Sequence, residues 1–343
     1  MTQDRLRVRR LRRIPRAATL ATVGALVMTT VALGQDDTGI SDADTTASLP
    51  MGRLLWTSDR ARDGSLSVWM LESGAEEPRR LTTGEVNDFT AELSPDGATL
   101  VFASDRDNPS ALTASGSYLR AYDLYLTGVD GGEPQRLHGD RTFKMRPTWS
   151  PDGSRIAFDG EDPDGEPVPE TGGPTPQIWV VQSDGSGSPA MLTEERGGAL
   201  DPAWSPDGSR IAYRSLDDGR IISMAVDGSD TTALTDGPGD AEPEWSPDGT
   251  RIVFSSERDG DRDIYVMAAD GSDVTRLTDS PDFDGQPTWS PDGTMVAVVT
   301  DRGPSRDVYL MNADGSGQVD VSSNGPGDDG EHRGSDFSPS WSE

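Results

Sequence analysis

Residues 245–278 read WSPDGTRIVFSSERDGDRDIYVMAADGSDVTRLT, and this stretch recurs along the chain. Self-similarity at a period of about 40 residues is the signature of a repeat architecture. The chain is therefore predicted to consist of six related units. Their first residues, called the repeat residues below, are Leu93, Trp149, Trp204, Trp245, Trp289 and Trp341.

Each unit is predicted to form four short strands. Ser246–Gly249 suits a tight turn, because proline fixes φ, aspartate bonds to its own backbone and glycine tolerates positive φ. Arg251–Ser256 and Asp263–Ala268 are rich in β-branched and aromatic residues, which is typical of strands. Arg276–Thr278 supplies a short outer strand. Four antiparallel strands repeated radially make a β-propeller blade.

Two incomplete units complement each other. Arg53–Ser58, Leu66–Leu71 and Arg80–Thr82 resemble strands two to four of a unit with no first strand before them. The last copy has only a first strand, which ends at Trp341, because the sequence stops two residues later. We therefore predict an all-β fold for residues 51–343, a six-bladed β-propeller of four-stranded antiparallel blades. Its C-terminal strand joins the N-terminal blade and closes the ring, which removes open sheet edges.

The first 50 residues differ from the repeats. Seven arginines precede the apolar run Ala17–Leu33, and Gly34 follows it, which is the layout of a secretory signal. An uncleaved membrane anchor is the alternative for residues 1–34, because the apolar run is long. Residues 35–50 are acidic and are predicted to form a disordered spacer. We expect an exported protein, periplasmic, secreted or held in the cell envelope, with no membrane insertion beyond residues 1–34.

The charge of the chain excludes one class of partner. The formal net charge is −30, and without residues 1–34, which hold seven Arg and one Asp, 23 basic and 59 acidic residues remain. Such a surface repels nucleic acid, which requires basic patches. We expect a monomer that binds no nucleic acid.

The loops predicted on the two faces of the propeller differ. The Ser-Pro-Asp-Gly turns on one face are nearly identical, whereas Asp105–Ala121 and Asp159–Pro176 are long insertions on the other. The segment Val321–Ser338 adds a long link between blades on this variable face. Insertions on one rim of a rigid scaffold are the usual place for binding, although they can also be tolerated loops without a role.

The mouth of the central channel is the second candidate site. The residues just before each inner strand are expected to line it on the variable face. They are Asp88, Arg146, Asp201, Asp240, Glu242, Asp284 and Asp336. Carboxylates around a narrow channel could hold a hard cation such as Ca²⁺, with Asp201, Glu242 and Asp284 as the candidate metal ligands. They could equally attract a basic peptide or form a solvated rim.

Recognisable catalytic motifs are absent from the sequence. The chain has no Cys and only two His, His138 and His332, and it contains no G-x-S-x-G elbow, phosphate loop or H-E-x-x-H motif. We therefore expect no enzymatic activity. Paired carboxylates for glycoside chemistry remain open, because any two of the many acidic residues can converge. The repeat tryptophans are expected to pack in the core, and the Asp-Arg pairs after the second strands, such as Asp105–Arg106, to bridge strands or blades.

The motif P-x-W-S-P-D-G, followed by D-[IV]-Y-[VL]-M-x-x-D-G-S and R-L-T, resembles the WD-like propeller repeats of the TolB family. The resemblance covers about residues 51–343. It implies a six-bladed propeller that binds protein, as in the periplasmic component of the Tol–Pal envelope system. The spacer stands where TolB proteins carry an α/β domain, so a propeller-only member is expected. Similar repeats also form the gating propeller of prolyl-oligopeptidase-like peptidases.

These observations lead to one prediction of function and one alternative. The prediction is a non-enzymatic TolB-like scaffold that binds protein or another envelope polymer through the variable face and the channel mouth. The alternative is a propeller enzyme that acts on a glycan or polysaccharide with carboxylates of the channel.

Overall fold

The computed structural model describes residues 49, 51–61, 63, 65–107, 111–112, 118–119, 122–138, 143–161, 175–303, 305–322 and 335–343. The predicted signal or anchor in residues 1–34 lies outside them, as do His332, most of both insertions, most of the link Val321–Ser338 and nearly all of the predicted spacer. All regular elements of the described residues are β-strands. No helix in this part of the chain is long and apolar enough to span a membrane.

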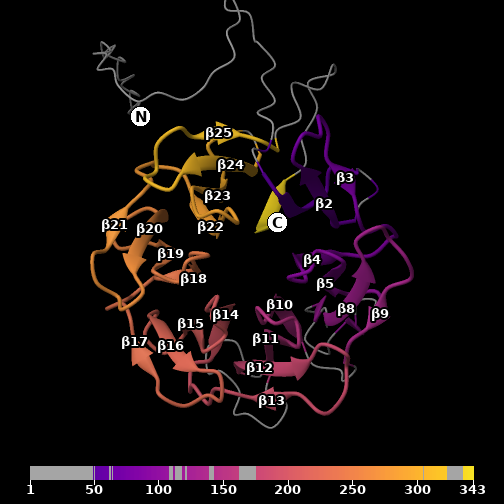
Figure 1. The fold of residues 1–343 in the computed structure, drawn as a ribbon, viewed down its shortest axis with the longest axis horizontal. Helices are drawn as coiled ribbons and strands as arrows, with labels where there is room; N and C mark the ends of the chain where they lie inside the picture. Colours follow the sequence, from indigo (N-terminus) through magenta and orange to yellow (C-terminus); the bar gives the residue numbers. More distant parts are fainter. Residues whose placement is uncertain are drawn as a thin grey trace, which may run out of the picture. The chain divides into compact units, whose positions relative to one another are not determined.

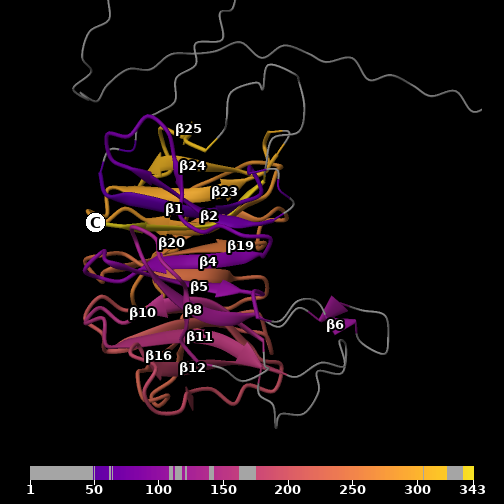
Figure 2. The same cartoon turned by 90° about the vertical axis from the view of Figure 1, so that its right-hand side faces the viewer.

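Six four-stranded antiparallel sheets form the blades of a ring (Figure 1). Blade 1 has the order β26-β1-β2-β3, with β26 at Asp336–Ser342, β1 at Arg53–Ser58, β2 at Ser67–Glu72 and β3 at Arg79–Arg80. Blade 2 has the order β4-β5-β8-β9, with β4 at Asp88–Leu93, β5 at Thr99–Ser104, β8 at Asp123–Gly128 and β9 at Gln135–Arg136. The short pair β6 (Ala111–Leu112) and β7 (Tyr118–Leu119) lies in its insertion, on one side of the ring (Figure 2).

The other four blades follow the chain without interruption. Blade 3 comprises β10 (Lys144–Trp149), β11 (Arg155–Glu161), β12 (Pro176–Gln182) and β13 (Ala190–Met191). Blade 4 comprises β14 (Ala199–Trp204), β15 (Arg210–Ser215), β16 (Ile221–Ala225) and β17 (Thr232–Ala233). Blade 5 comprises β18 (Ala241–Trp245), β19 (Arg251–Ser256), β20 (Asp263–Ala268) and β21 (Thr275–Arg276). Blade 6 comprises β22 (Asp284–Trp289), β23 (Met295–Thr300), β24 (Asp307–Asn312) and β25 (Val319–Asp320).

The predicted fold and its ring closure are confirmed. β26 pairs antiparallel with β1, with Leu54 opposite Trp341 and Ser58 opposite Asp336. In Figure 1 the yellow C-terminal strand accordingly lies beside the indigo N-terminal blade. The Trp341 indole N–H also donates to the carbonyl oxygen of Met51, at 2.9 Å.

The hydrophobic core consists of six clusters, each shared by two neighbouring blades. One combines Val101 of blade 2 with Trp149 and Phe158 of blade 3. The repeat tryptophans pack in these clusters as predicted; Trp289, for example, is 2% exposed. Leu49, which belongs to the predicted spacer, is also buried and packs beside Trp341 in the cluster between blades 6 and 1. Packing thus reaches at least two residues before the predicted start of the propeller.

The Ser-Pro-Asp-Gly turns have the hydrogen bonds that the sequence predicts. In blade 5, Asp248 Oδ1 accepts from the Ser246 hydroxyl at 2.6 Å and from the Thr250 backbone N–H at 3.0 Å. These bonds, the serine bond foremost, lower the pKa of Asp248 to about 2. Asp152 accepts the equivalent bonds from the Ser150 hydroxyl and the Ser154 backbone N–H in blade 3, and its pKa is likewise lowered to about 2. The repeated aspartates of this face therefore stabilise the turns.

Candidate functional site

A cavity of about 320 Å³ lies between the inner strands of all six blades. Its walls begin three residues before each repeat residue and continue toward that residue, as in Arg146–Trp149 of β10. The cavity therefore occupies the channel from the middle of the inner strands toward the face that carries the Ser-Pro-Asp-Gly turns.

A β-bulge in every inner strand determines which side chains reach this cavity. In blade 3, Met145 pairs with Asp159 and Thr148 pairs with Ala157, so two residues on β10 face one residue on β11. The first bulge residue has positive φ in all six blades, with values between 45° and 58°. We call these six residues the first ring: Thr90, Arg146, Asp201, Glu242, Gln286 and Ser338.

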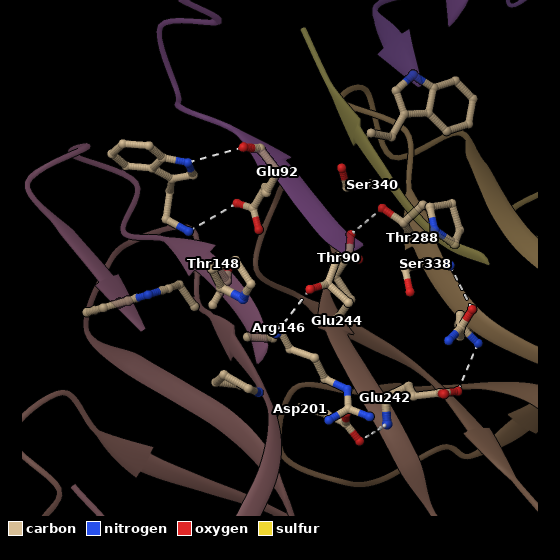
Figure 3. Close-up of a pocket in the computed structure, with 18 of the residues that line it drawn as sticks. Thr90, Glu92, Arg146, Thr148, Asp201, Glu242, Glu244, Thr288, Ser338 and Ser340 are labelled. Carbon is tan, nitrogen blue, oxygen red and sulfur yellow. Dashed lines mark hydrogen bonds and ion pairs between the residues drawn. The ribbon is translucent and has the colours of Figure 1, made fainter. Parts of the chain in front are cut away.

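The first ring links neighbouring blades at five of the six junctions. A side-chain oxygen of one blade accepts the backbone N–H of the first-ring residue in the following blade (Figure 3). The four bonds are Arg146 N to Thr90 Oγ1 at 3.2 Å, Glu242 N to Asp201 Oδ2 at 3.4 Å, Gln286 N to Glu242 Oε2 at 2.8 Å and Ser338 N to Gln286 Oε1 at 2.8 Å. Arg146 has no acceptor to offer, and its Nε instead lies 2.7 Å from Asp201 Oδ1. The bulge leaves these N–H groups outside the sheet ladder, and the neighbouring blade satisfies them.

The structure brings three of the seven predicted channel residues to the cavity and corrects the placement of four. Arg146, Asp201 and Glu242 line it. The other four lie two residues earlier in their blades, are at most 2% exposed and do not line the cavity: Asp88, Asp240, Asp284 and Asp336. In an unbulged strand, residues two apart share a face. The extra residue of the bulge turns the earlier position away from the channel.

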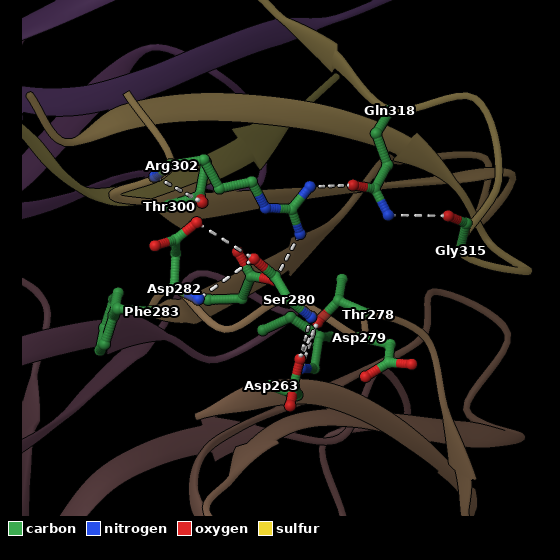
Figure 4. A network of polar contacts seen from close by, with 12 residues as sticks. Asp263, Thr278, Asp279, Ser280, Asp282, Phe283, Thr300, Arg302, Gly315 and Gln318 are labelled. Atoms are coloured by element: carbon green, nitrogen blue, oxygen red, sulfur yellow. Dashed lines mark hydrogen bonds and ion pairs between the residues drawn. The ribbon is translucent and has the colours of Figure 1, made fainter. Parts of the chain in front are cut away.

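Each of these four aspartates pairs with the arginine that follows the second strand of its own blade. The pairs are Asp88–Arg106 at 2.9 Å, Asp240–Arg258 at 2.9 Å, Asp284–Arg302 at 2.5 Å and Asp336–Arg60 at 2.8 Å. Arg302 is held from its other side by Gln318, which donates to the Gly315 carbonyl at 3.0 Å (Figure 4). The arginines that follow the second strands, such as Arg106, therefore bridge two strands of one blade, as the sequence predicted. We call the position of these aspartates the ion-pair position.

The three candidate metal ligands do not converge. Asp201 pairs with Arg146, Asp284 with Arg302, and Glu242 accepts from Gln286 N and from the Ser255 hydroxyl at 2.8 Å. Among the described residues, no group of three or more His, Cys, Asp or Glu side chains is arranged to hold a metal ion.

The sequence analysis missed two glutamates that line the cavity. Glu92 and Glu244 stand immediately before the repeat residues of blades 2 and 5. Glu92 Oε1 accepts the Trp149 backbone N–H at 3.2 Å, and Glu244 Oε1 accepts the Trp289 backbone N–H at 2.9 Å and the Thr288 hydroxyl at 3.0 Å. Burial raises the pKa of Glu92 to about 7 and that of Glu244 to about 8, although these hydrogen bonds oppose the rise.

A third carboxyl group with a raised pKa, that of Asp159, lies beside the first ring. Burial raises the pKa of Asp159 in β11 to about 7, while the Arg146 guanidinium, 3.1 Å away, opposes the rise. Arg146 therefore lies between two carboxylates, Asp159 and Asp201. Its positive charge is paired with these two residues of the protein itself.

Six bulged blades in a closed ring make the fold a β-propeller with a polar channel. A comparison of the sequence with models of protein families gives the same assignment. The family model described as the TolB beta propeller domain matches residues 110–260 and 168–342, more than half of the chain. The protein belongs to this TolB β-propeller family, as its repeat motifs predicted.

Three curated relatives share parts of the chain. An uncharacterised protein of Agrobacterium fabrum, Atu1656, is 32% identical over 54% of this chain and 59% of its own length. YuxL of Bacillus subtilis, described as an uncharacterised peptidase, is 30% identical over 43% of this chain and 24% of its own. The Tol-Pal system protein TolB of Anaeromyxobacter dehalogenans is 35% identical over 34% of this chain and 25% of its own. The matches thus span 24–59% of the length of these relatives.

Solved structures share the fold at low identity. TolB from Acinetobacter baumannii superposes with a TM-score of 0.68 at 17% identity, over 85% of this chain and 66% of that one. An oligogalacturonate lyase in complex with manganese superposes with a TM-score of 0.53 at 19% identity, over 79% of this chain and 74% of that one. The propeller is therefore shared by proteins with different activities.

Proposed function

We propose that this protein is an exported, non-enzymatic scaffold that binds a protein or another envelope polymer through its variable face and its channel. Residues 1–34 would direct export or anchor the chain, and the propeller that follows the spacer would hold the binding site. Membership of the TolB family and the relative named as a Tol-Pal system protein support an envelope role.

The first ring is the observation that carries the proposal. It presents six different side chains to one cavity, and hydrogen bonds to the next blade hold most of them in place. Rigid, pre-positioned polar groups lower the entropic cost of binding. Four of the six side chains, those of Thr90, Asp201, Glu242 and Gln286, already accept a backbone N–H within the ring. This arrangement suits recognition by shape and charge better than proton transfer to a substrate.

Site-specific photo-cross-linking in the native bacterium tests this proposal. A photoreactive phenylalanine analogue would replace Asp261 on the variable face, Ser338 in the channel or Val274 on the opposite face. Asp261 is exposed between β19 and β20, and Val274, 41% exposed, lies between β20 and β21. We expect one adduct of the same mass from Asp261 and Ser338 and none from Val274, which precedes the outermost strand of its blade and does not line the cavity. Adducts from Val274 alone would contradict the proposal.

A polysaccharide-acting enzyme is the second candidate, because two glutamates with raised pKa values line one cavity. Carboxyl groups poised near neutral pH are suited to general acid–base catalysis. Incubation with polysaccharides, including oligogalacturonate, would then release new reducing ends. Replacement of either Glu92 or Glu244 by Gln should lower that rate by about a hundredfold or more. If the wild-type chain releases no product, this candidate is eliminated.

A further inference from the structure

We propose that Arg306 on the variable face receives a carboxylate of a protein partner, from a segment in which the neighbouring side chains are uncharged. The inference rests on the proposed function, because it states which chemical group of the partner the variable face recognises. Arg306 stands directly before β24 in blade 6 and does not line the cavity. The repeat pattern did not mark it as a site.

Arg306 lies on the variable face where blade 6 meets blade 1. Its backbone carbonyl accepts the N–H of Asp336, the first residue of β26, at 2.9 Å. Arg262 has the same place one blade earlier, because its carbonyl accepts the N–H of Asp284, the first residue of β22, at 2.9 Å. Each of the two arginines is therefore fixed beside the start of an inner strand.

Two phenylalanine rings hold the Arg306 side chain. Its guanidinium carbon lies 4.7 Å from the ring centre of Phe283 and 5.5 Å from that of Phe337. A guanidinium over an aromatic face is attracted by the ring and can still donate hydrogen bonds from its edge. The guanidinium of Arg262 approaches the Phe283 ring as well, at 5.8 Å. Stacking on the rings thus positions the charge of Arg306 for a ligand.

The Phe283 ring occupies a place that the backbone of β22 leaves open for it. A Cβ atom on Gly285 would lie 2.5 Å from Cζ of Phe283 and 3.3 Å from Oε2 of Glu242, so a side chain at this glycine would displace the ring. Glu242 lines the channel cavity. The stacked arginine is therefore built into the rim of the channel, within the surface proposed for the partner.

A comparison within the molecule shows what Arg306 lacks. Three other arginines of the described residues also stack on two aromatic rings, and each of them pairs with an aspartate: Arg60, Arg106 and Arg258. Arg306 has the two rings, but within the described part of the chain its guanidinium has neither an ion pair nor a hydrogen bond. A planar guanidinium suits a carboxylate through two parallel hydrogen bonds. A partner carboxylate would complete at Arg306 the arrangement that the other three have within the protein.

The charges around the site favour a protein segment over an acidic polysaccharide. Asp282 and Asp301 are exposed next to Phe283, and Asp301 Oδ1 accepts the Phe283 backbone N–H at 2.8 Å. These carboxylates, and the net charge of −30, repel a polymer with a negative charge on every sugar. A peptide can place one carboxylate on Arg306 and uncharged groups beside the two aspartates.

Photo-cross-linking in the native bacterium is the first test, with the photoreactive phenylalanine analogue at Asp261, next to Arg262. The adduct yield is compared in the otherwise unchanged chain, in Arg306→Gln and in Arg155→Gln. Arg155 is the matched control: its guanidinium stacks on the Trp204 ring at 4.8 Å, it has no ion pair to the residues that the structure describes, and it begins β11 on the opposite face. We expect Arg306→Gln to lower the yield about fivefold or more and Arg155→Gln to leave it within about twofold.

A double-mutant cycle with the cross-linked partner is the second measurement. Mass spectrometry of the adduct locates the partner segment, and each of its acidic residues is replaced by the corresponding amide. Replacement of the carboxylate that contacts Arg306 should weaken binding about tenfold to the wild-type chain and less than about twofold to Arg306→Gln. The urea midpoint of Arg306→Gln should equal that of the wild type, because the substitution breaks no ion pair between described residues.

The outcomes separate this inference from the scaffold function. An adduct yield that Arg306→Gln leaves unchanged would overturn the inference alone, as would a partner in which every replacement weakens binding equally to both chains. An adduct that polysaccharide-degrading enzymes remove and proteases leave intact would overturn it in favour of an acidic polymer. If neither Asp261 nor Ser338 gives an adduct in the otherwise unchanged chain, the scaffold function itself fails, and the inference fails with it.

Discussion

Deletion of Asp336–Glu343 should abolish the cooperative folding of the propeller. This segment is the inner strand of blade 1, and without it β1 loses one of its two neighbouring strands and the ring has an open sheet edge. The core between blades 6 and 1 also loses Trp341, and truncation of a buried tryptophan alone costs about 3–5 kcal/mol. The buried pair Arg60–Asp336 is broken in the same step, which leaves an unpaired guanidinium.

Urea denaturation followed by tryptophan fluorescence measures the effect. We expect the truncated chain to show no sigmoidal transition and to associate through its open edge. A synthetic peptide of residues 335–343 added in trans should restore the transition, because it can pair with β1. The control removes only Glu343, which is exposed. A truncated chain that unfolds in one transition at the wild-type urea midpoint would refute the role given to β26.

Replacement of Lys144 by Ala should destabilise the protein by about 3–5 kcal/mol, the usual cost of removing one partner of a buried ion pair. Lys144 is the only lysine of the chain, and it is 2% exposed. It occupies the ion-pair position of blade 3, where four other blades carry aspartate. Its Nζ lies 3.1 Å from Asp123 of blade 2, so this pair joins two blades. Asp123 is fully buried and also pairs with Arg136.

The shift of the urea midpoint at constant slope gives this free energy. The matched control is Arg79→Ala, because the Arg79–Glu72 pair is exposed on both sides and should contribute about 0.5 kcal/mol or less. The double variant Lys144→Met/Asp123→Asn should recover part of the loss, since it removes both buried charges. If Lys144→Ala and Arg79→Ala cost the same, the buried pair does not contribute as proposed.

The fold was predictable because its local signals agree with one another. The Ser-Pro-Asp-Gly turn, the β-branched second and third strands and the repeat tryptophan recur in one order. The missing first strand before Arg53 identified β26 as its partner. Strand ends were less certain. β2 runs Ser67–Glu72, whereas the pattern predicted Leu66–Leu71, because one apolar run fits two neighbouring registers.

The candidate site was predictable only in part. Counting back from the repeat residue identifies acidic residues, but it does not reveal the bulge that separates Glu242 from Asp240. Glu242 lines the cavity, whereas Asp240 is buried against Arg258. A proline after the first-ring residue in five blades was the available signal, since proline in a sheet is tolerated at bulges. Gln286 and Ser338 could have been placed in the channel by this rule, whereas Thr90, which Ala91 follows, could not.

Glu92 and Glu244 had no such signal. Each is a single acidic residue beside a core residue in a strand, which ordinarily indicates a solvent-facing position. Only the closure of six blades around one axis brings their side chains into a common cavity. The raised pKa values of both groups follow from burial in that cavity, a property that no linear pattern contains.

The bulge in the inner strands separates two kinds of mutation in the same short segment. Changes at the ion-pair position break buried ion pairs, whereas changes at the first ring alter the group presented to the cavity together with one bond to a neighbouring blade. Natural variation can therefore alter the lining of the channel one blade at a time, while the arginine pairs that hold the blades stay intact. A small number of substitutions, each at one known place in the repeat, would suffice to redirect such a propeller to a new partner.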